Sequence, residues 1–227
     1  MKYLVTLALS LFLSGTAFSQ FGLNATYRSN TAPDWQFVNF NEEEALLPAS
    51  AIAFGVDYWI PLKTVRIDLL PELNFSKMSS TLDSRANTQL DNTWLSLYLN
   101  ANIYFLNLEG DCDCPTFSKS GGVFDKGLFL QLSPGATWMR NEVSAEGQSQ
   151  DSNDFAFSIA AGLGLDLGLS DFLTLTPFAG LRYYLPTQWQ SLELLQENGG
   201  IKETYLKDDT SSLRQLYGGL RLGFRLR

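Results

Sequence analysis

Residues 65–76 read VRIDLLPELNFS, a stretch in which apolar and polar side chains alternate strictly. In an extended chain, one face would carry Val65, Ile67, Leu69, Pro71, Leu73 and Phe75. The other face would carry Arg66, Asp68, Leu70, Glu72, Asn74 and Ser76. Because successive side chains of a β-strand point to opposite faces, the stretch predicts a strand between an apolar and a polar environment.

The same period of two recurs along most of the chain. It is clearest in AIAFGVDYWI (51–60), in FAFSIAAGLGLDLGL (155–169) and in the C-terminal stretch 216–227. With weaker cases included, the pattern predicts eight strands, at about 20–28, 50–60, 65–77, 92–105, 127–140, 154–169, 172–185 and 214–227. Several short alternating segments of this kind indicate an all-β fold.

The predicted connections alternate in length. Long polar connections are expected at 29–49, 78–91, 141–153 and 186–213, and short turns fall at about 61–64 and 170–171. One connection on the short side, 106–126, is long. Short turns at one end and long loops at the other are typical of an antiparallel up-and-down transmembrane β-barrel in a bacterial outer membrane, with the long loops outside the cell.

Composition excludes several other classes of protein. After the first 20 residues the chain has no apolar stretch of the roughly 20 residues that a membrane-spanning helix needs. The net charge of −8 argues against a nucleic-acid partner. The chain has no histidine, which excludes a Ser-His-Asp hydrolase and a His-ligated zinc site.

Alternation alone does not separate a membrane barrel from a soluble, lipocalin-like ligand-binding barrel of the periplasm, whose apolar side chains point inward. Two features of the polar face favour the membrane barrel. This face is rich in Gly, Ala and Ser, which suit a crowded lumen, and of the seven lysines only Lys77 falls in a predicted strand. A soluble surface is usually rich in Lys and Glu.

An eight-stranded barrel has a lumen that side chains fill. The predicted inward charges are Asp57, Arg66, Asp68, Glu72, Asp166, Arg182, Arg221 and Arg225. The predicted inward rings are Trp59, Trp94, Tyr98, Tyr104, Phe129, Phe178 and Tyr184. Four acids against four arginines suggest a paired network that fills the lumen, which we favour over a proton or ion relay.

The N-terminal stretch MKYLVTLALSLFLSGTAFSQ has the charge, apolar core and small residues of a secretory signal peptide. It predicts residues 1–19 as a cleaved signal peptide and residues 20–227 as a single outer-membrane barrel domain. The alternative is an uncleaved membrane anchor.

Two features lie outside the strand pattern. Cys112 and Cys114, in the 106–126 connection, predict a tight disulfide that staples a turn; a redox or metal role is the alternative. The segment WQSLELLQE (189–197) predicts a short helix with Trp189, Leu192 and Leu195 on one face. That face would either cap the barrel or meet a partner.

The sequence also resembles a known family. The stretches AFSQ (17–20), IDLLPELNFS (67–76), LSLYLNANIYF (95–105) and GGLRLGFRLR (218–227) are similar to those of the PorT-like outer-membrane β-barrel family of Bacteroidetes-type bacteria. The resemblance implies an outer-membrane location, and in some members a role in protein secretion or assembly. It supplies no catalytic residues.

These observations lead to an expected function. We expect a non-enzymatic outer-membrane barrel that displays its loops to a partner or assists outer-membrane secretion or assembly machinery. We expect no catalytic, cofactor or metal site, and contacts with outer-membrane lipid and with other outer-membrane or periplasmic proteins. The alternative is transport of ions or small solutes through a narrow or gated barrel.

Overall fold

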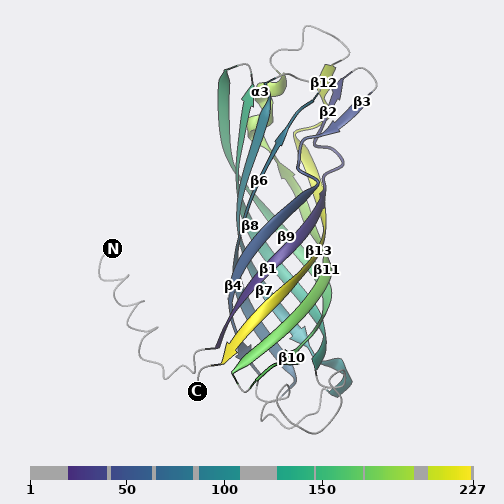
Figure 1. The fold of residues 1–227 in the computed structure, drawn as a ribbon. Coiled ribbons are helices and arrows are strands. Elements are labelled where there is room, and N and C mark those ends of the chain that lie inside the picture. Colours follow the sequence, from purple (N-terminus) through teal and green to yellow (C-terminus); the bar gives the residue numbers. More distant parts are fainter. Residues whose placement is uncertain are drawn as a thin grey trace, which may run out of the picture.

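A computed structural model describes residues 20–39, 42–62, 65–83, 87–107, 127–145, 147–170, 172–196 and 204–225. Within these ranges, eight long strands are β1 (Gln20–Thr31), β4 (Ser50–Tyr58), β6 (Ile67–Thr81), β7 (Gln89–Ile103), β8 (Leu128–Ala145), β9 (Gln148–Leu165), β11 (Leu173–Gln188) and β13 (Thr210–Arg225). Each pairs antiparallel with its neighbours, and β1 pairs with β13 to close the sheet. The predicted eight-stranded antiparallel barrel is confirmed (Figure 1).

The two faces of the wall point as predicted. Leu73 and Phe75 of β6 are 48% and 47% exposed, whereas the residues that follow each of them, Asn74 and Ser76, are each 1% exposed. The outward face of every long strand carries large apolar side chains, and the inward face is largely polar. A lipocalin-like soluble barrel would have the reverse arrangement, so that alternative is wrong. No helix among the described residues has the length and apolar character needed to cross a membrane.

Two of the predicted long loops are shorter than expected. Half of residues 78–91 belong to β6 and β7, and most of residues 141–153 belong to β8 and β9. The prediction failed because it ended each strand where the outward side chains become polar. The backbone ladder continues beyond that point, since hydrogen bonding between strands does not require an apolar face.

The other two long connections fold over one end of the barrel. The connection after β1 forms β2 (Gln36–Asn39) and β3 (Glu42–Ala45). The connection after β11 forms the 3₁₀ helix η2 (Gln190–Leu192), α3 (Glu193–Gln196) and β12 (Thr204–Leu206). Strands β12, β2 and β3 make a small second sheet that lies with α3 at the end opposite β10 (Leu167–Gly168) (Figure 1).

The turn end of the barrel carries smaller elements. They are β5 (Ile60–Pro61), which extends the ladder with β6, β10, which pairs with β11, and the 3₁₀ helix η1 (Phe105–Asn107). The predicted signal peptide, residues 1–19, and the predicted disulfide of Cys112 and Cys114 lie outside the described residues. Both therefore stay predictions.

Leu97→Arg tests the outward face. Leu97 is 61% exposed near the middle of β7, so the variant would place a charge in the lipid core at a cost of about 2–4 kcal/mol. We expect a loss of folded protein, measured by urea unfolding in lipid vesicles. Ser50→Arg, at the outer end of β4 where polar residues begin, should cost only about 0–1 kcal/mol. Equal losses from both variants would contradict the assigned membrane position.

Candidate functional site

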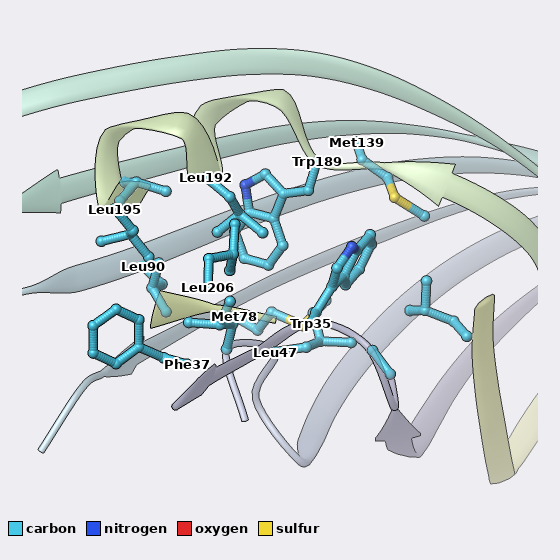
Figure 2. Close-up of a cluster of buried hydrophobic side chains, with 14 of the residues drawn as sticks. Trp35, Phe37, Leu47, Met78, Leu90, Met139, Trp189, Leu192, Leu195 and Leu206 are labelled. Carbon is cyan, nitrogen blue, oxygen red and sulfur yellow. The ribbon is translucent and has the colours of Figure 1, made fainter. Parts of the chain in front are cut away.

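A hydrophobic core fills the outer mouth of the barrel. We call the elements that cover this mouth the cap: residues 32–39, 42–47, 189–196 and 204–209. The cap contributes the buried side chains of Ala32, Trp35, Phe37, Leu46, Leu47, Trp189, Leu192, Leu194, Leu195 and Leu206. The barrel wall contributes those of Ala51, Met78, Leu82, Leu90, Trp94, Met139, Val143, Ala145, Ala156, Tyr184 and Leu213. Figure 2 shows side chains from both sets meeting over the strands.

The centre of the cap is a pair of tryptophans from the two long connections. The rings of Trp35 and Trp189 lie edge to face with centroids 5.2 Å apart, and both side chains are at most 1% exposed. Trp35 Nε1 donates to the Asp209 carbonyl at 2.9 Å, and Trp189 Nε1 donates to Ser191 Oγ at 2.8 Å. Two segments more than 150 residues apart in sequence are therefore held together. The apolar face of the segment that begins at Trp189 caps the barrel, which is one of the two roles that the sequence analysis left open.

The solvent side of the cap is acidic. Glu42, Glu43 and Asp208 are exposed on it, and the Glu43 carboxylate lies 3.7 Å from Lys207 Nζ. A hydrogen bond from Gln188 lowers the pKa of Asp209 below its usual value. At neutral pH this face therefore carries a net negative charge.

Below the cap, the buried side chain of Arg182 lies in the lumen. Its guanidinium lies over the Tyr98 ring, 3.6 Å from the centroid, and donates to Ser133 Oγ at 2.8 Å and Ser158 Oγ at 2.9 Å. The Tyr98 hydroxyl lies 3.1 Å from that of Tyr184. These contacts join β11 to β9, β8 and β7 inside the barrel, in a position that a pore would need to keep open.

The next layer is an ion pair between Asp57 and Arg221. Arg221 donates from Nε to Oδ2 at 2.7 Å and from Nη2 to Oδ1 at 2.6 Å, and Asp57 is 4% exposed. Gly22 makes room for the pair, since a Cβ there would lie 2.5 Å from both Arg221 Nε and Asp57 Oδ2. Such bidentate geometry is the strongest form of the carboxylate–guanidinium contact.

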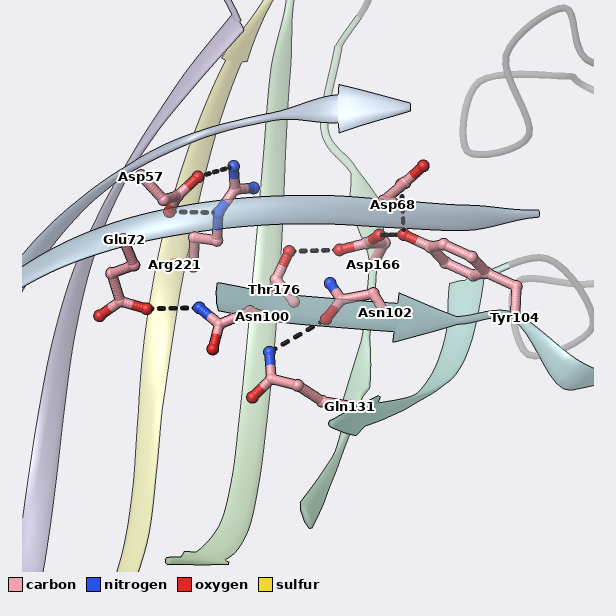
Figure 3. Close-up of polar contacts among 10 residues, drawn as sticks. All are labelled: Asp57, Asp68, Glu72, Asn100, Asn102, Tyr104, Gln131, Asp166, Thr176 and Arg221. Carbon is pink, nitrogen blue, oxygen red and sulfur yellow. Dashed lines mark hydrogen bonds and ion pairs between the residues drawn. The ribbon is translucent and has the colours of Figure 1, made fainter. Parts of the chain in front are cut away.

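The remaining acids accept hydrogen bonds mainly from neutral groups (Figure 3). Glu72 accepts from Asn100 Nδ2 at 2.7 Å and Asn74 Nδ2 at 3.0 Å. Arg28, an inward arginine that the sequence analysis missed, donates to Asn74 Oδ1 at 2.6 Å. The alternation of Asn24, Thr26 and Arg28 in the first predicted strand was the signal for it.

At the turn end, Asp68 and Asp166 share the hydroxyl of Tyr104. The hydroxyl oxygen lies 3.0 Å from Asp68 Oδ2 and 2.5 Å from Asp166 Oδ2, and Thr176 also donates to Asp166. Arg66 lies over the Tyr104 ring at 5.1 Å. A phenol has a single hydrogen, so it donates to one of the two carboxyl groups at a time.

The predicted charges therefore do not form four ion pairs. They lie at three heights in the lumen: Arg182 below the cap, the Asp57–Arg221 pair in the middle, and Asp68 and Asp166 at the turn end. The backbone of Arg225 pairs with Gln20 at the end of β13, and its side chain lies outside the description. Among the described residues, no group of three or more His, Cys, Asp or Glu side chains is placed to hold a metal ion. The predicted absence of catalytic, cofactor and metal sites stays a prediction.

The free space in the lumen is small. One cavity of about 40 Å³ is lined by Arg28, Asp57, Glu72 and other polar residues, and one of about 30 Å³ lies nearer the turn end beside Tyr104. A water molecule needs at least about 10–15 Å³ of such space, so each cavity holds a few waters at most.

Comparisons with known proteins give one family match. The family model described as Autotransporter beta-domain matches residues 50–227. No curated protein sequence matches the chain.

Solved structures of outer-membrane proteins resemble the chain at low sequence identity. Neisserial surface protein A is 11% identical with a TM-score of 0.46, and the match covers 93% of this chain and 100% of that one. Ail, the attachment invasion locus protein of Yersinia pestis, is 10% identical with a TM-score of 0.47, over 91% and 99% of the two chains. The outer-membrane protease OmpT from Escherichia coli is 4% identical with a TM-score of 0.42, over 92% and 98%.

Proposed function

The chain belongs to the autotransporter β-domain family and is an outer-membrane β-barrel, and from that premise we propose that it is a non-enzymatic interaction protein. In this proposal the barrel is an anchor with a closed lumen, and the cap is the surface that meets a partner. The observation that carries it is the hydrophobic core in the outer mouth. Such a core holds two long connections in one shape, as a binding surface requires.

Part of the cap lies outside the residues that the family model matches. The family match begins at residue 50, so β1, β2 and β3 lie before it. The acidic outer side, with Glu42, Glu43 and Asp208, suits a partner that presents a basic surface.

The proposal includes a narrower identity. We propose that the chain is PorT-like and assists outer-membrane secretion or assembly machinery, with residues 1–19 removed as a signal peptide. The sequence stretches already quoted support the resemblance. The absence of histidine supports the non-enzymatic assignment, because it removes the most common general base.

A conductance measurement tests the closed lumen. We expect the purified full chain, inserted in planar bilayers, to give no stable single-channel currents, because side chains fill the lumen around small cavities of about 40 and 30 Å³. Stable currents from the wild-type protein would refute the proposal and support transport of ions or small solutes.

A crosslinking experiment tests the binding surface. Crosslinking in intact outer membranes, followed by purification of the chain, should recover one partner reproducibly, and Glu42→Lys should reduce its yield. Ser170→Lys, which adds a positive charge at the turn between β10 and β11, at the opposite end of the barrel from the cap (Figure 1), is the matched control. Equal yields from the wild type and Glu42→Lys, or equal losses from both variants, would argue against the cap as the binding surface.

A further inference from the structure

The outward face of the barrel changes from apolar to polar at a defined level near the cap. On seven strands the first outward polar residues are Ser29, Ser50, Lys77, Thr93, Arg140, Asn153 and Arg214. Directly below them lie large apolar side chains such as Phe75, Trp138 and Leu216, all more than 40% exposed. This level is where the lipid chains of the outer leaflet end and their headgroups begin.

Basic side chains on the outer surface of the wall gather at this level. Of the basic residues whose side chains the structure describes, Arg28, Arg66, Arg182 and Arg221 lie in the lumen, and Lys207 lies on the cap. Lys77, Arg140 and Arg214 face outward at the boundary. Arg140 has an acidic neighbour, Asp151, at 3.8 Å, whereas Lys77 and Arg214 have no ion pair within the described ranges.

Arg214 differs from Lys77 because a groove lies beside it. The groove has a volume of about 550 Å³ and crosses β1, β13, β11, β9 and β8. One paired row across these strands is Ser29, Leu216, Leu181, Ala161 and Leu132. The next row toward the cap is Thr31, Arg214, Tyr183 and Ile159.

The depth of the groove follows from side-chain size. Ala161 is small, and its neighbours in the row, Leu132 and Leu181, extend outward as the sides of a depression. The lower part is therefore apolar. The end toward the cap carries the guanidinium of Arg214 and the hydroxyl groups of Thr31 and Tyr183.

We propose that this groove is a binding site for a phosphorylated glycolipid of the outer leaflet. One acyl chain lies in the apolar part over Ala161, and a phosphate on the sugar headgroup pairs with Arg214. The hydroxyls of Thr31 and Tyr183 lie at the same end and provide hydrogen bonds for a phosphorylated sugar. The volume falls within the range of about 300–1,000 Å³ that is usual for specific ligand sites.

The test is lipid retention by the full-length protein in detergent. Lipid A bearing phosphate groups is added, and the bound fraction is measured by native mass spectrometry across a concentration series. We expect the wild type to retain one lipid A, and Arg214→Ala to bind it about fivefold more weakly, since one basic residue at a lipid surface contributes about 1 kcal/mol. Ala161→Phe, which fills the groove and leaves Arg214 in place, should lower retention at least as much.

Two controls make the result specific. Lys77→Ala removes a basic residue at the same boundary on β6, outside the residues that line the groove, and should leave retention unchanged. Lipid A from which the phosphates have been removed should bind the wild type as weakly as Arg214→Ala binds the phosphorylated form. Folding of each variant is checked by its shift on gels with and without heating.

Three results would overturn the site. They are equal retention by the wild type and Ala161→Phe, equal losses from Lys77→Ala and Arg214→Ala, and no effect of removing the phosphates. The second result would mean that any boundary cation attracts the lipid. The third would mean that the groove takes acyl chains without regard to the headgroup.

Discussion

Trp189→Ala is expected to open the cap while the barrel below it stays closed. The side chain is fully buried against Trp35, and truncation of a buried tryptophan costs about 3–5 kcal/mol. The cap is held to the wall mainly by this core, because its sheet (β12, β2 and β3) is separate from the sheet of the barrel, so the loss falls on the cap. Proteinase K added to the protein in lipid vesicles should cleave the cap of the variant many times faster than that of the wild type.

Trp138→Ala is the matched control for the cap. Trp138 is a tryptophan of the wall that faces outward and is 44% exposed, so its loss leaves the core intact. Cleavage of the cap should be unchanged in this variant. If Trp189→Ala left the cap as resistant as the wild type, the buried core would not be what holds it in place.

Asp57→Ala is expected to destabilise the barrel by about 3–5 kcal/mol. The change leaves Arg221 buried without its carboxylate, and an unpaired buried charge costs more than the lost attraction alone. Urea unfolding in lipid vesicles measures the change. The double variant Asp57→Ala/Arg221→Ala should recover part of the loss, because it removes the stranded charge.

Asp151→Ala provides the comparison for an exposed ion pair. Asp151 lies 3.8 Å from Arg140, and both side chains are more than half exposed, so the expected cost is about 0–1 kcal/mol. If Asp57→Ala were as mild as Asp151→Ala, water would reach Arg221 freely, and the lumen would be wetter than its cavities imply.

The alternation of side chains was enough to predict the wall of the barrel. Residues 65–76 alternate because one face meets lipid and the other meets the lumen. This alternation can be recognised from adjacent residues alone. The facing of Leu73 and Asn74, the eight strands and their antiparallel order all follow from it. Strand ends did not follow, since beyond the membrane the outward face becomes polar while the ladder continues.

The partners of the charged side chains in the lumen could not be predicted from the sequence, because they are set only when the barrel closes. The sequence analysis named most of the inward charges, but their partners are set by the stagger between strands that are far apart in the chain. Asp57 and Arg221 are 164 residues apart and meet only because β1, which pairs with both β4 and β13, brings their strands to its two sides. For the same reason Glu72 accepts from Asn100 on the next strand rather than from an arginine.

The cap was decided by tertiary structure alone. Met78, Leu90 and Val143 lie on the inward face, which is polar lower in the barrel. They are apolar because they pack in one buried core with Trp35 and Trp189 of the cap. No local period links residues from two connections and seven strands. The sequence by itself therefore determined a barrel in the outer membrane, because alternation is local. The closed mouth required the folded chain, because a hydrophobic core assembled from distant segments leaves no repeat in the sequence.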